Sequence, residues 1–114
     1  MENIDLTYLN EISGGDNSFI KEMLDLFIIT TAIEVNEFDH LLANSNYEAI
    51  GQLAHKMKAP IQMLGASKLF EILRTIEQNG KNRTNIETFP NTINEVKVKI
   101  GELTNSIRNL LETM

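Results

Sequence analysis

Apolar residues recur every three or four positions along most of the chain, which is the spacing of helices that bury one face. The strict alternation that is typical of a half-buried strand is not the dominant pattern. The clearest run is the last one, where apolar residues continue three or four apart through Ile93, Val96, Ile100, Leu103, Ile107, Leu110 and Met114. The pattern predicts an all-α fold.

Glycine, proline and asparagine mark the places where these helices should end. Asp16 and Asn46 suit N-cap positions, and Gly65 and Gly80 suit C-terminal ends. A proline is favoured in the first turn of a helix. The breaks therefore predict five helices, over about 5–13, 17–43, 46–64 and 66–79 and from Pro90 onward, with a polar loop over 81–88.

Four long amphipathic helices with short connections predict an antiparallel four-helix bundle, with the short first helix capping one end. The chain has 114 residues, which is the usual size of one domain, so we expect a single domain over 1–114. On the second helix we expect the inward positions to be Phe19, Met23, Leu26, Phe27, Ile33, Phe38, Leu41 and Leu42.

Composition excludes several classes of protein. The chain has no cysteine, so disulfides, thiolate metal sites and thiol catalysis are absent. A net charge of −6 argues against a nucleic-acid partner. The longest apolar run, Leu26–Ile29, is too short to cross a bilayer, and the acidic start does not resemble a signal peptide. We expect a soluble, cytoplasmic protein that has no membrane partner and is monomeric.

The third predicted helix carries the candidate chemistry. His55 lies roughly 150° from the centre of its apolar face, so the imidazole should point outward. Gly51 and Ala59, one turn before and after, should leave that imidazole open, with Lys58 and Gln62 alongside. The apolar face itself consists of Ile50, Leu53, Ala54, Met57, Ile61 and Leu64.

Two interpretations of His55 remain open at this point. An open, neutral imidazole is a nucleophile, and a lysine one turn away can stabilise the charge that develops on a phosphoryl group. A histidine beside a lysine can equally be an ordinary solvated face. Glu77 on the fourth helix has the same two interpretations: it accepts a hydrogen bond from His55 Nδ1 and selects the tautomer, or it is an exposed helix glutamate.

Other catalytic and cofactor sites are not indicated. His40 is the only other histidine, and the spacing of the acidic residues does not suggest a metal site. Ser67 and Thr75 have no visible base partner for hydrolysis. Gly14 and Gly15 break a helix and do not form a phosphate-binding loop. We therefore expect no metal or cofactor.

Residues 54–66 read AHKMKAPIQMLGA. This segment resembles the signature of histidine-containing phosphotransfer (HPt) domains, in which Ala-His-x-apolar-Lys-Gly is followed by an apolar-Gly pair. The positions that match include His55, Met57, Lys58, Leu64, Gly65 and Ala66. The likeness extends over nearly the whole chain, through Tyr8-Leu9, the turn at Gly14-Gly15-Asp16, the region of Phe27 and the segment from Leu73 to Glu77.

The resemblance implies a phosphocarrier without ATP-dependent kinase activity. By this likeness His55 Nε2 takes a phosphoryl group from the aspartate of one receiver domain and passes it to another, while Lys58 stabilises it. The partners it implies are response-regulator receiver domains and a hybrid sensor histidine kinase. The receiver brings its own acidic pocket and Mg²⁺.

The chain departs from the family pattern at two positions. Ala59 replaces the usual glycine and narrows the approach to His55. Pro60 removes a backbone donor and crowds the carbonyl of Lys56, so we expect a kink just after His55, which affects the placement of Gln62. These departures keep open a second function, a binding module that docks a receiver or kinase without carrying phosphate. A third, an enzyme with His55 as general base, has less support.

Overall fold

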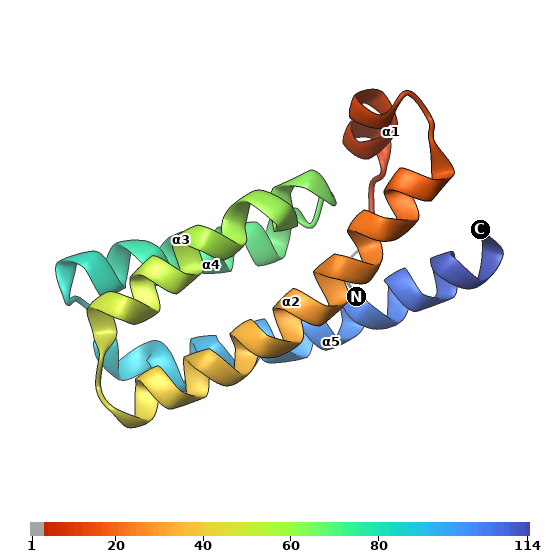
Figure 1. Ribbon diagram of the computed structural model, residues 1–114. Helices are drawn as coiled ribbons and strands as arrows, with labels where there is room; N and C mark the ends of the chain where they lie inside the picture. Colours follow the sequence, from red (N-terminus) through yellow and green to blue (C-terminus); the bar gives the residue numbers. More distant parts are fainter. Residues whose placement is uncertain (1–3) are drawn as a thin grey trace.

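The computed structural model describes residues 4–114, and this range is all-α, as predicted. Residues 1–3 of the predicted 1–114 domain lie outside the described residues. A short 3₁₀ turn over Ile86–Thr88, which was not predicted, precedes the last helix. The elements are α1 (Thr7–Ser13), α2 (Asn17–Ala43), α3 (Tyr47–Met63), α4 (Ser67–Asn82), η1 (Ile86–Thr88) and α5 (Phe89–Thr113) (Figure 1).

The four long helices form an antiparallel bundle about 42 Å long (Figure 1). Helix α2 packs against α3 and α5, and α4 also packs against α3 and α5, so the four helices close a ring. The short α1 lies at the end of the bundle where α2 begins, and the Asp5 N–H donates a hydrogen bond of 2.8 Å to the Leu64 carbonyl. The predicted bundle with a short additional helix is confirmed. None of the helices within 4–114 combines the length and apolarity that a membrane span requires.

The predicted N-caps of the second and third helices are confirmed. The Asp16 side chain accepts hydrogen bonds from the first-turn N–H groups of α2, and Asn46 accepts one from the Ala49 N–H. Gly65 follows α3 with a φ of 72°, a conformation that glycine adopts without strain. The prediction that Gly80 ends the fourth helix is wrong, because α4 continues to Asn82 and Arg83 adopts the left-handed cap.

The predicted inward face of the second helix is partly wrong. Phe27 and Phe38 are buried, but Phe19, Leu26 and Ile33 are exposed. The apolar pattern alone does not predict which face of this helix is buried, because apolar residues lie both on the face toward the core and on an exposed stripe. The buried positions of α2 are Ile20, Leu24, Phe27, Thr31, Glu34 and Phe38. On the other helices the core follows the predicted faces of α3 and α5, although Leu110 and Met114 are not buried.

Two glycines let the backbones of α3 and α4 touch. A Cβ atom placed on Gly80 would lie 2.7 Å from both the Gly51 Cα and the Tyr47 carbonyl oxygen. A Cβ on Gly51 would lie 3.0 Å from the Glu77 carbonyl oxygen. These neighbours are backbone atoms, which cannot turn away as a flexible side chain can. Glycine is therefore required at position 80 for the two helices to pack this closely.

We expect Gly80→Ala to lower the free energy of unfolding by about 1–3 kcal/mol, because the added methyl forces α4 away from α3. Alanine favours the helix over glycine by about 1 kcal/mol. A net loss of stability would therefore show that the steric clash outweighs this gain. Urea denaturation followed by circular dichroism measures the difference.

Gly101→Ala is the matched control, since a Cβ on this α5 glycine would meet nothing within 4 Å. This variant should be stabilised by roughly 0.5–1 kcal/mol, the ordinary gain from replacing a helix glycine. If both variants gained stability to the same extent, the close contact between α3 and α4 would not be a steric constraint.

Candidate functional site

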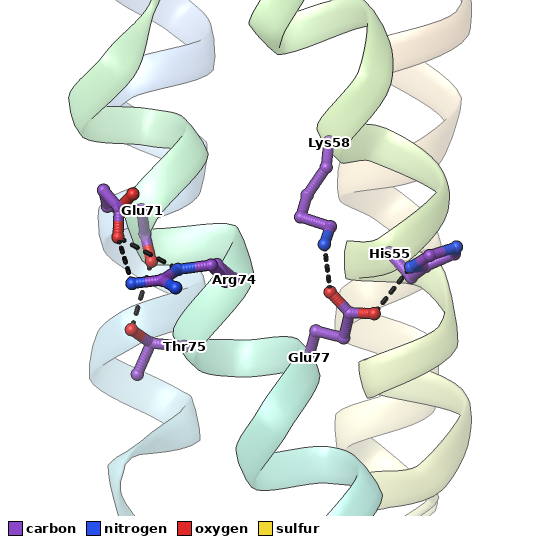
Figure 2. A network of polar contacts seen from close by, with 6 residues as sticks. All are labelled: His55, Lys58, Glu71, Arg74, Thr75 and Glu77. Carbon is purple, nitrogen blue, oxygen red and sulfur yellow. Dashed lines mark hydrogen bonds and ion pairs between the residues drawn. The ribbon is translucent and has the colours of Figure 1, made fainter.

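Three of the predicted site residues meet between α3 and α4 (Figure 2). The His55 Nδ1 atom lies 2.5 Å from Glu77 Oε2. The other oxygen of the same carboxylate, Oε1, lies 2.5 Å from Lys58 Nζ. Glu77 thus bridges the imidazole and the ammonium group. The His55 side chain remains 69% exposed, whereas those of Lys58 and Glu77 are largely covered.

The close contact of the two helices explains why Glu77 reaches His55. Gly51 lies one turn before His55 on α3, and Glu77 lies one turn before Gly80 on α4. Where the backbones touch, a side chain as short as glutamate spans the remaining gap. The distance between the imidazole and the carboxylate is therefore determined by the backbone packing.

The hydrogen bond to Glu77 determines which nitrogen of His55 is free. An ionised carboxylate only accepts hydrogen bonds, so Nδ1 carries the hydrogen. In the neutral ring the lone pair then resides on Nε2. Figure 2 shows that the ring extends from its bond with Glu77 in the direction away from α4. The side chain therefore presents a nucleophilic nitrogen at the surface.

Lys58 is held beside the imidazole by two contacts. In addition to the ion pair with Glu77, its Nζ atom lies 5.7 Å from the centre of the Phe70 ring, within range of a cation–π interaction. Phe70 was not among the predicted site residues. A signal for it existed in the sequence, because Phe70 precedes Glu77 by two helical turns and therefore shares its face of α4.

Comparison with known proteins identifies the family. A family model described as the Hpt domain matches residues 22–113. This chain belongs to the Hpt domain family. Hpt domains are histidine phosphotransfer modules of two-component signalling; they are phosphocarriers rather than kinases and interact with receiver domains and kinases.

A solved structure shares the fold of this Hpt domain. The crystal structure of histidine-containing phosphotransfer protein B (HptB) from Pseudomonas aeruginosa PAO1 superposes with a TM-score of 0.88. The match covers 98% of this chain and 96% of that one at 15% sequence identity. Among curated protein sequences, none matches this chain significantly.

The carboxylate of Glu77 is ionised in this Hpt domain. The hydrogen bond from Lys58 lowers the pKa of Glu77, the bond to His55 lowers it further, and partial burial opposes both. The negative charge thus persists at neutral pH, where it can stabilise positive charge on both neighbours.

The remaining predicted site residues, Gly51, Ala59 and Gln62, are not part of the contact among His55, Glu77 and Lys58. Gly51 is buried against α4, where its small size serves the helix contact; the expectation that it also leaves the approach to the imidazole open stays a prediction. Ala59 and Gln62 are exposed on α3, one and two turns beyond His55. Helix α3 continues through Pro60 to Met63, and the kink stays a prediction.

Neighbouring polar residues form a separate network. Arg74 pairs with Glu71 at 2.9 Å, and Thr75 donates to the Glu71 carbonyl, on the side of α4 away from His55 (Figure 2). Between residues 4 and 114 no three histidine, cysteine, aspartate or glutamate side chains are grouped to hold a metal ion.

The lowered pKa of Glu77 predicts a pH-dependent contribution to stability. This contribution is complete above the pKa of an unfolded glutamate, about 4.3, and is lost as the pH falls through the lower folded value. We expect Glu77→Gln to lower the free energy of unfolding by about 1 kcal/mol at pH 7. The difference from the wild type should shrink at pH 3. Urea denaturation at both pH values measures it.

Glu71→Gln provides the control for this experiment. Glu71 also forms an ion pair, but both partners are more than half exposed, so its removal should change stability by less than about 0.5 kcal/mol. A loss in Glu77→Gln that is the same at pH 3 and pH 7 would contradict an electrostatic origin.

The tautomer of His55 can be tested directly. ¹⁵N NMR of the neutral ring should show hydrogen on Nδ1 in the wild type, because Glu77 accepts it. In Glu77→Ala the signals should move towards a mixture of tautomers, while those of His40 stay unchanged. An unchanged His55 spectrum in Glu77→Ala would show that the carboxylate does not select the tautomer.

Proposed function

We propose that this Hpt domain carries a phosphoryl group on His55 Nε2 between the aspartates of two receiver domains. The observation that carries the proposal is the exposed imidazole whose Nδ1 is engaged by Glu77, since Nε2 is then the available nucleophile. A hybrid sensor histidine kinase with a receiver of its own would be the upstream source.

The transfer of the phosphoryl group needs no reactant other than His55 and the phosphorylated receiver. The Nε2 lone pair attacks the phosphorus of the receiver's phosphoaspartate, and the N–P bond forms as the bond between phosphorus and the aspartate oxygen breaks. The aspartate leaves as a carboxylate, and the Nδ1 hydrogen stays on the ring. The ring thereby gains positive charge, which the neighbouring carboxylate of Glu77 stabilises. The second transfer reverses these steps on another aspartate.

Lys58 and Mg²⁺ share the stabilisation of the phosphoryl oxygens in this proposal. Lys58 lies one turn from His55, and its flexible stem would let the ammonium move from Glu77 towards a phosphoryl group on Nε2. The receiver domain would contribute Mg²⁺ from its own acidic pocket. The Hpt domain then supplies the nucleophile and one positive charge.

An exposed apolar stripe on α2 supports docking of a receiver. Leu26, Ile29 and Ile33 are each more than half exposed, and α2 lies beside α3 in the bundle. Neighbouring apolar residues of this kind mark protein interfaces when they form a continuous patch. A monomeric Hpt domain would have this surface free for its partner.

Phosphate uptake tests the proposal. The chain is incubated with a ³²P-labelled phospho-receiver and Mg²⁺, without ATP. We expect label that is lost in acid and survives base, as a phosphohistidine requires, and its disappearance in His55→Gln. His40→Gln removes the other histidine, an exposed residue of α2, and should retain the label.

The same experiment distinguishes the alternative function. The methyl group of Ala59 lies one turn from His55 on the exposed side of α3 and favours a module that docks without accepting phosphate. Absence of label from a broad panel of receivers, together with receiver binding that is equal in the wild type and His55→Gln, would replace the carrier by that binding module.

A further inference from the structure

A pocket of about 300 Å³ opens between α1, α2 and the C-terminal end of α3, and its lining includes no residue of α4. This volume is at the lower end of the range for small-molecule sites. The walls are almost entirely apolar and include Leu9, Met23, Leu26, Phe27, Pro60 and Met63. Such a lining suits an occupant with a compact apolar body.

Three of the lining residues are polar, Thr30, Thr31 and Glu34, and of these only Glu34 can carry a charge. Its side chain is buried, at 5% exposure, and within the described chain no hydrogen bond to its carboxylate is found. Burial raises the pKa of Glu34, attraction by Lys56 lowers it, and repulsion by Glu37 raises it. A carboxylate in an apolar wall attracts a positive charge, so a ligand that brings a hydrogen-bond donor and a positive charge would be stabilised there.

Within the described residues, neither threonine of the lining donates a hydrogen bond to the Glu34 carboxylate. The Thr31 hydroxyl is occupied, because it donates a hydrogen bond of 2.8 Å to the Phe27 carbonyl. The pocket therefore combines apolar walls with the Glu34 carboxylate and two threonine hydroxyls, neither of which donates to that carboxylate within the described residues.

We propose that this pocket binds a small amine with an apolar body, whose ammonium group pairs with the Glu34 carboxylate. The apolar body would lie against Met23, Leu26 and Met63. A neutral ligand of the same shape would leave the carboxylate unpaired, and an anion would be repelled by it. The proposal rests on Glu34 and the pocket walls and does not require phosphotransfer on His55.

The test compares three ligands of similar shape: cyclohexylamine, cyclohexanol and cyclohexanecarboxylate. Both Met23 and Met63 line the pocket, so their ¹³C-labelled methyl groups report occupancy by NMR. We expect cyclohexylamine to bind roughly tenfold more tightly than cyclohexanol, as a charge-assisted hydrogen bond implies, with the weakest binding for the carboxylate. Equal binding of the amine and the alcohol would overturn the proposal.

Glu34→Gln tests the role of the carboxylate. Glutamine has nearly the same shape and removes a buried charge, so the bundle should fold, as circular dichroism would verify. We expect the preference for the amine to disappear in this variant. Glu37→Gln is the matched control: it removes the same charge from an exposed position one turn away and should keep the preference. A preference that survives in Glu34→Gln would show that the Glu34 carboxylate does not hold the amine. A preference that disappears in Glu37→Gln as well would show that the amine responds only to net charge, and either result would overturn the proposal.

Discussion

The contact between the backbones of α3 and α4 at Gly51 and Gly80 is the constraint on which the site depends. With any larger residue at position 80 the helices would separate, and the carboxylate of Glu77 would move away from His55 and Lys58. The hydrogen bond to Nδ1, the exposure of Nε2 and the position of the lysine all follow from this approach. The chemistry of the site is thus a consequence of helix packing.

Much of the site was predictable because it depends on helical geometry. The outward direction of His55 follows from its angle to the apolar face of α3, and Lys58 follows at the next turn. The contact with Glu77 was one of two open interpretations, because sequence spacing within α4 does not say how closely that helix approaches α3. The periodicity of α5 similarly indicated a bundle helix before its neighbours were known.

The features that escaped prediction depend on tertiary contacts. A glycine near the end of a helical pattern ordinarily indicates a C-cap, and only the presence of α3 shows why Gly80 lies inside α4. Leu26 and Ile33 are as apolar as the buried residues of α2, so their exposure depends on which face meets the core. Glu34 looks like an ordinary surface glutamate until its burial is known.

The position of the site along the chain affects how it assembles. His55 and Glu77 are 22 positions apart, whereas the Lys97–Asp39 pair that links α5 to α2 spans 58. Closing the loop between His55 and Glu77 costs about 1 kcal/mol less in chain entropy than closing the loop between Asp39 and Lys97. The histidine and its carboxylate thus belong to a local hairpin, and their alignment carries a smaller cost in chain entropy than the contact that joins α5 to α2.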